Sequence, residues 1–174
     1  MLKKKICLLG YYGVGKTSLV AKFVSGMFSE KYLTTVGAKV DKKTLQVDGQ
    51  AVTLMLWDLA GQEDGAPIKL NSVRDAGGIL LVADGLRAKT LAAAVEIQQR
   101  AHIEFGRLPF LLLLNKADLR AQWEVQDADI ADLQARGWNI LSTSAKTGQN
   151  VEGAFLQLAK ALLKADEDRE EDDA

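Results

Sequence analysis

A glycine-rich segment between an apolar run and an amphipathic stretch constrains the fold of this chain more than any other feature. Residues 10–17 read Gly-Tyr-Tyr-Gly-Val-Gly-Lys-Thr and directly follow the apolar run at residues 6–9. Beyond this segment, apolar residues at positions 19, 20, 23 and 24 share one face of a helix. A strand that is apolar throughout, followed by a tight turn and a helix, predicts the first unit of a parallel sheet covered by helices.

Later segments extend this pattern. Residues 79–83 and 110–114 are two more apolar runs of strand length, and residues 140–141 indicate a last strand. The turn signal Asp48-Gly49 precedes alternating apolar residues at 52, 54 and 56, which predicts an antiparallel pair over about residues 38–57. Helices are expected over about residues 125–136 and along the apolar positions 151, 155, 158 and 162.

Together these elements predict an α/β fold. We expect a doubly wound, mostly parallel six-stranded sheet with one antiparallel edge strand and helices on both faces. Sheets of this kind bind their ligands at the carboxyl ends of the strands. The glycine-rich segment stands at such an end, because it follows an expected strand directly.

Length and composition restrict the function further. The 174 residues suit one domain, which we place at 1–165, with a disordered acidic tail at 166–174. The net charge of −1 provides no basic field for nucleic acid or an anionic membrane surface. Cys7 is the single cysteine, which excludes an internal disulfide and a cysteine-based zinc cluster. No segment approaches the ~18 apolar residues of a membrane helix, so we expect a cytoplasmic protein.

The glycine-rich segment has the spacing of a phosphate-binding loop. Its glycines let the backbone turn so that successive N–H groups point into one hollow at a helix N-terminus, which suits an anion. Lys16 would bring a positive charge to the outer phosphates, and the Thr17 hydroxyl is a hard oxygen ligand for Mg²⁺. These residues predict a site for nucleotide phosphates and leave the base undetermined.

Two further segments bear on the base. Asn115-Lys116-Ala117-Asp118 directly follows the apolar run at 110–114, and Ser144-Ala145-Lys146 follows the last expected strand. The Asp118 carboxylate can accept hydrogen bonds from N1–H and N2–H₂ of guanine, whereas adenine offers no such pair of donors. Guanine is therefore predicted over adenine. The alternative, an ATP-using phosphate-loop enzyme, would share Lys16 and Thr17 but has no use for Asp118.

With these motifs in order, the chain resembles a small GTPase of the Ras superfamily from Lys3 to about Leu163. The resemblance rests on the phosphate loop, Thr35 in a first switch segment, the run Asp58-Leu59-Ala60-Gly61-Gln62-Glu63, and the two base segments. Thr34-Thr35-Val36-Gly37 and Trp57 look most like the Rab type. The resemblance implies a GTP-binding G domain of the P-loop NTPase fold at residues 1–165. Such a domain binds GTP and GDP with Mg²⁺, hydrolyses GTP slowly and works as a molecular switch.

The family's functional residues carry over to the matching positions of this sequence. Gln62, Lys16 and Thr35 would be catalytic, with Gln62 orienting the attacking water. Mg²⁺ would be held by Thr17, Thr35 and Asp58. The nucleotide would contact Gly10, Tyr12, Gly13, Val14, Gly15, Lys16, Thr17, Ser18, Phe28, Gly61, Asn115, Lys116, Asp118, Ser144, Ala145 and Lys146. By contrast, Asp84 is interpreted as a structural residue near a helix start, and His102 as a surface or packing histidine.

The resemblance also implies effector, exchange-factor and activating proteins that bind a monomer through residues of about 30–40 and 61–75. Tyr12 occupies a position that is often glycine in this family, and we hypothesise that its phenol hinders an arginine supplied by an activator. No cysteine stands near the C-terminus, so we expect neither prenylation nor a stable membrane anchor. A nucleotide-binding scaffold without turnover is the second alternative that the sequence leaves open.

Overall fold

The computed structural model describes residues 2–28 and 37–174. Its strands are β1 (Leu2–Gly10), β2 (Ala38–Val47), β3 (Gln50–Leu59), β4 (Gly78–Asp84), β5 (Phe110–Asn115) and β6 (Ile140–Thr143). Its helices are α1 (Lys16–Ser25), α2 (Ala88–Phe105), α3 (Asp127–Ala135) and α4 (Val151–Asp173), with short 3₁₀ segments at Asn71–Val73 and Ala117–Gln122. Among the described residues, no helix combines the length and the apolar character needed to cross a bilayer.

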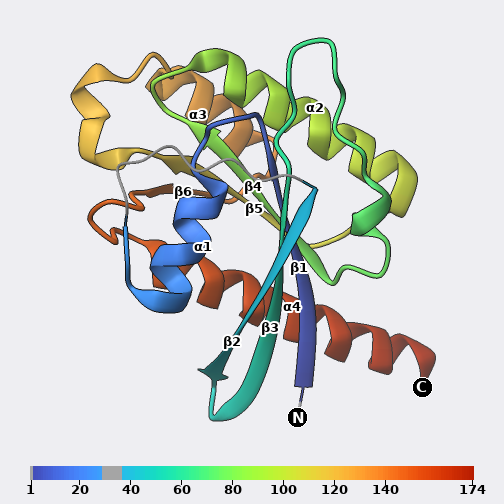
Figure 1. The fold of residues 1–174 in the computed structure, drawn as a ribbon. Helices are drawn as coiled ribbons and strands as arrows, with labels where there is room; N and C mark the ends of the chain where they lie inside the picture. Colours follow the sequence, from blue (N-terminus) through green and yellow to red (C-terminus); the bar gives the residue numbers. More distant parts are fainter. Residues whose placement is uncertain (1, 29–36) are drawn as a thin grey trace.

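The described strands form one six-stranded sheet in the order β2-β3-β1-β4-β5-β6. The edge strand β2 pairs antiparallel with β3, and the other neighbouring strands are parallel. This confirms the predicted mostly parallel sheet with one antiparallel edge strand. Because β1 lies between β3 and β4, the chain leaves β1 at the point where the strand order changes direction (Figure 1). Ligands of doubly wound sheets bind at such a point.

Alternate residues of β1 contribute to two separate cores. Ile6 and Leu8 point into a core that also contains buried residues of α1 and α4. Cys7 and Leu9 point into the opposite core, which α2 and α3 cover. In the first core the rings of Phe23 and Phe155 are stacked with their centroids 4.0 Å apart. The sheet therefore carries helices on both faces, as the fully apolar runs predicted.

Two boundaries differ from the sequence-based expectation. Helix α3 begins at Asp127, because the Asp129 carboxylate accepts a hydrogen bond from the Gln126 backbone N–H at 2.9 Å and closes a capping box there. Residues 166–173, expected as a disordered tail, continue α4, and Asp166 forms an ion pair with Lys4 of β1. Extending an existing helix requires no new nucleus, and the three glutamates and the arginine of this segment have good helix propensity.

Gly85, directly after β4, provides a test of the second core. A Cβ atom added at Gly85 would lie 2.0 Å from Cε2 of the buried Trp123 ring, so the ring or the backbone would have to shift. We expect Gly85→Ala to lower the free energy of unfolding by about 2–3 kcal/mol, measured by urea titration of Trp fluorescence. Gly153→Ala is the matched control, because an added Cβ there meets nothing within 4 Å. The control should be unchanged or up to about 1 kcal/mol more stable; equal effects of the two variants would contradict the packing argument.

Candidate functional site

The loop after β1 is shaped by glycines that tolerate no side chain. Gly13 and Gly15 have left-handed backbone conformations, with φ of 74° and 102°. A Cβ atom at Gly10 would lie 2.4 Å from the Val82 carbonyl oxygen, and one at Gly15 would lie 2.2 Å from Nδ2 of Asn115. The loop is thus pressed against the ends of β4 and β5. The close approach leaves room for backbone only, as a phosphate cradle requires.

Lys16, Thr17 and Asp58 gather where this loop enters α1. The Thr17 hydroxyl donates to Oδ2 of Asp58 at 2.5 Å, and Asp58 is fully buried at the end of β3. Lys16 is 6% exposed; burial lowers the pKa of its ammonium to about 8, and the nearby Asp58 carboxylate limits that fall. Lys16 therefore keeps its positive charge at pH 7 although little of it reaches water.

The residues after β3 are joined to the loop after β1 by a short parallel bridge. The Tyr12 N–H donates to the Gln62 carbonyl at 2.8 Å, and the Gln62 N–H donates to the Gly10 carbonyl at 2.9 Å. Gly61 lies against the loop so closely that a Cβ atom on it would be 2.7 Å from Cα of Tyr12. The structure thus brings Gly61 and Gln62 beside the glycine-rich loop after β1.

The two base segments meet at the ends of β5 and β6. Asn115 donates from Nδ2 to the Val14 carbonyl at 3.0 Å, which ties the base segment to the phosphate loop. The exposed Asp118 accepts a hydrogen bond from the buried Ser144 hydroxyl at 2.8 Å through Oδ1. The Ala145 N–H donates to Oδ1 of Asn115 at 3.4 Å. These bonds hold the Asp118 carboxylate and the Ala145 backbone N–H close to the glycine-rich loop.

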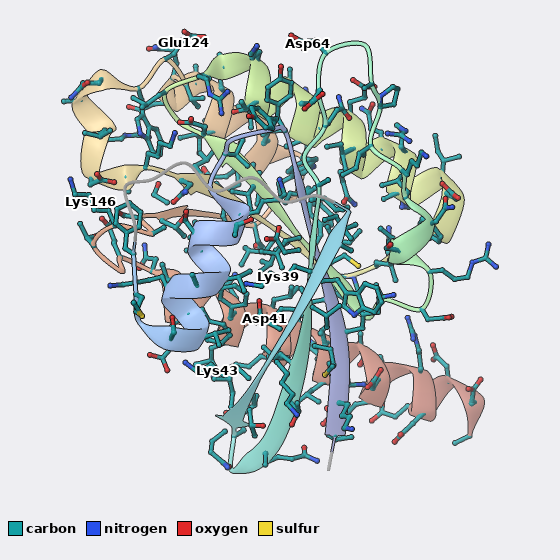
Figure 2. All side chains as sticks on the ribbon, in the orientation of Figure 1. Lys39, Asp41, Lys43, Asp64, Glu124 and Lys146 are labelled. Carbon is teal, nitrogen blue, oxygen red and sulfur yellow. The ribbon has the colours of Figure 1, made fainter. Side chains whose placement is uncertain are left out.

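The other residues predicted for the nucleotide site lie farther from these contacts or outside the described residues. Ser18 lies in the first turn of α1, and Phe28 lies just beyond α1 with 38% of its surface exposed. Lys146 is exposed in the loop after β6 (Figure 2). Thr35 and Thr34 fall outside the described residues, so their roles stay predictions. His102 is exposed on α2, in agreement with its interpretation as a surface residue.

Asp84 is more than the structural residue that the sequence suggested. Its Oδ1 accepts from the Leu86 N–H at 2.9 Å, as expected near a helix start, but its Oδ2 also accepts from Lys116 Nζ at 2.7 Å. The signal that was missed is the strand alignment, because Asp84 ends β4 directly beside Asn115 of β5. The buried Asp84 carboxylate is therefore in direct contact with the base segment.

Comparison with known proteins identifies this arrangement. The Ras family model matches residues 5–164. The chain belongs to the Ras family. It is 38% identical to human "Ras-related protein Rab-37" over 168 residues, which cover 92% of this chain and 74% of that protein. It is 36% identical to "Ras-related protein Rab-1" of Theileria parva over 162 residues, covering 91% of this chain and 73% of the relative.

A third relative is dog "Ras-related protein Rab-13", 35% identical over 164 residues, which cover 91% of this chain and 79% of that protein. All three relatives carry Rab names, as the resemblance of residues 34–37 and Trp57 to the Rab type predicted. This small GTPase is therefore a GTP hydrolase that binds GTP and GDP and acts as a switch. The predicted Ras-superfamily identity is confirmed.

Proposed function

We propose that this GTPase works with Mg²⁺, hydrolyses GTP slowly when unaided, and changes the conformation of residues of about 30–40 and 61–75 between its GTP and GDP states. The observation that carries the proposal is the meeting of three parts at one edge of the sheet: the phosphate loop, the Gly61-Gln62 bridge and the Asp118–Ser144 pair. In this proposal the loop binds the phosphates, Gly61 and Gln62 lie beside the γ-phosphate, and the Asp118 carboxylate recognises guanine.

The donor set beside Lys16 supports the metal. A hydroxyl and a carboxylate already in contact, Thr17 and Asp58, are the hard oxygen groups that Mg²⁺ selects, and few protein ligands are needed because phosphates and water complete the shell. Thr35 would add a third oxygen. Bound Mg²⁺ would supply positive charge to the outer phosphates, alongside the Lys16 ammonium.

Gln62 is proposed to orient the attacking water. Its Oε1 is buried and has no hydrogen-bond partner among the described residues, so this acceptor is free to receive a hydrogen bond. The backbone of Gln62 is held by Gly10 and Tyr12, which fixes the base of the side chain next to the phosphate loop. Orientation by a neutral amide contributes little proton transfer, which fits slow unaided turnover.

Partner proteins are proposed to bind the segment after Gln62. Residues 63–67 are exposed in the structure, whereas Ile68 and Leu70 are buried and anchor the segment on the sheet. Asp64 stands on this loop (Figure 2) and pairs with Lys89 of α2, with Nζ and Oδ2 3.6 Å apart. Effectors, exchange factors and activators would bind this segment together with residues 30–40. A monomeric state and a cytoplasmic location stay predictions.

Phosphate release from purified, GTP-loaded protein tests this function. With Mg²⁺ present, we expect a rate on the order of 10⁻⁴ to 10⁻² s⁻¹, and loss of turnover when EDTA removes the metal. Gln62→Leu should lower the rate at least about tenfold while GDP binding stays within about twofold. Gln99→Leu, an exposed glutamine of α2, is the matched control and should leave both values unchanged.

Two outcomes would replace the proposal. Guanine nucleotide binding without any phosphate release would favour the scaffold without turnover. Equal competition by ATP and GTP for the site would favour the ATP-using phosphate-loop enzyme.

A further inference from the structure

Both backbone groups of Tyr12, in the phosphate loop, are bonded to segments far away in the sequence. Its N–H donates to the Gln62 carbonyl at 2.8 Å, and its carbonyl accepts from Nη2 of Arg87 at 3.0 Å. Arg87 is the residue immediately before α2. Backbone carbonyls of a phosphate loop point away from the anion that its N–H groups face. The guanidinium therefore supports the loop from its outer side, without touching the place of the phosphates.

The Arg87 side chain is itself held in place by a buried acid. Its Nε donates to Oδ2 of Asp84 at 3.0 Å, and the guanidinium carbon lies 5.7 Å from the centroid of the Tyr11 ring. The side chain of Asp84 is 1% exposed and that of Arg87 is 34% exposed. A planar guanidinium can present separate N–H groups to the carboxylate and to the carbonyl, whereas an ammonium has no such fixed fork.

Asp84 continues this chain of contacts into the base segment. The same Oδ2 atom that accepts from Arg87 also accepts from Lys116 Nζ at 2.7 Å. Lys116 follows Asn115 in a left-handed conformation, with φ of 72°, which turns the chain toward Asp118. A continuous path of charged and polar contacts thus runs from Lys116 through Asp84 and Arg87 to the backbone of Tyr12.

We propose that Arg87 is a positioning residue that slows nucleotide release by fastening the phosphate loop to the base segment through Asp84. A nucleotide spans both segments and leaves when either one opens. The free energy of such local opening depends on the contacts that hold the segment, and Arg87 adds one charge-assisted bond to each side. The inference rests on the proposed function, because it takes the loop at residues 10–17 as the nucleotide cradle.

The release rate of a fluorescent GDP tests this inference. Parent, Arg87→Ala and Arg87→Lys proteins are loaded with N-methylanthraniloyl-GDP and chased with unlabelled GDP in Mg²⁺, well below their measured melting temperatures. Arg87→Ala should release the nucleotide about tenfold faster, equivalent to about 1.4 kcal/mol. Arg87→Lys should release the nucleotide at least about threefold faster than the parent, because an ammonium does not reproduce the two separate N–H groups that reach Asp84 and the Tyr12 carbonyl.

Arg107→Ala is the control, because Arg107 is an exposed arginine beyond the other end of α2. The Arg107→Ala protein should release labelled GDP at a rate within about twofold of the parent's. A lower melting temperature of Arg87→Ala with a parental release rate would assign Arg87 to stability alone and overturn the inference. If Arg87→Ala fails to fold, the test uses Arg87→Lys instead, and a parental release rate of that variant would overturn the inference. Failure of the parent to retain labelled GDP would instead overturn the nucleotide site itself.

Discussion

Asp118→Asn is expected to lower the affinity for GDP by about 100-fold or more and to raise the affinity for xanthosine diphosphate. Asp118 is placed by its hydrogen bond from Ser144 at 2.8 Å, so its carboxylate has a defined orientation at the proposed base site. Guanine offers two donors, N1–H and N2–H₂, and each bond to a charged acceptor contributes about 1.5–3 kcal/mol. An amide loses the charge and presents its own N–H₂ to guanine donors, whereas xanthine carries an acceptor at the 2-position.

Equilibrium titration with fluorescent guanine and xanthine nucleotides measures this change in preference. Asp132→Asn makes the same chemical change at an exposed position of α3 and should leave both affinities unaltered. A general loss of affinity for both bases would indicate damage to the fold. Unchanged GDP binding by Asp118→Asn would show that another group reads the guanine edge, and the assigned base site would then be wrong.

Lys16→Met is expected to weaken GDP and GTP binding by about 1000-fold. The Lys16 ammonium is almost entirely buried beside Asp58, and burial lowers its pKa to about 8, so it remains charged at neutral pH. Removing one partner of a buried charge pair costs about 2–5 kcal/mol, and here the phosphates would face the Asp58 carboxylate without a compensating cation. Methionine preserves the length and packing of the stem, so the loss can be attributed to the charge.

Isothermal titration of nucleotide-free protein measures this second effect. Lys164→Met on α4 is the control, because Lys164 is exposed and lies on an element that does not enter the nucleotide edge. Its affinity should match the parent's. Retention of binding within about tenfold by Lys16→Met would mean that backbone N–H groups alone bind the phosphates, contrary to the proposed site.

Local sequence patterns predicted the strands and turns that are determined by residues close together in the sequence. Fully apolar runs predicted β1, β4 and β5, and the Asp48-Gly49 turn predicted the β2–β3 hairpin. The phosphate loop and the base segments were predicted from their position after expected strands and from their order along the chain, because either base segment alone is also typical of an ordinary turn. Their meeting at one edge followed from the rule that parallel strands end together.

Contacts across long sequence separations were not predicted. No local pattern links Arg87 to Tyr12, since the bond depends on how α2 docks beside the end of β1. The bridge of Gln62 to Gly10 and Tyr12 likewise forms only after β1 and β3 are aligned in the sheet. The length of α4 was underestimated because a charge run predicts solvation, and a solvated segment can still continue a helix that has already formed.

The end of α4 has a practical consequence for attaching probes. From residue 167 onward the described side chains are exposed. Residues 167–173 therefore form about two exposed helical turns, roughly 10 Å long, at the end of α4. In Figure 1 this end points away from the carboxyl edge of the sheet, beyond the start of β1. A dye or immobilisation tag joined at Ala174 would therefore lie away from the proposed nucleotide site, and we expect it not to interfere with nucleotide exchange.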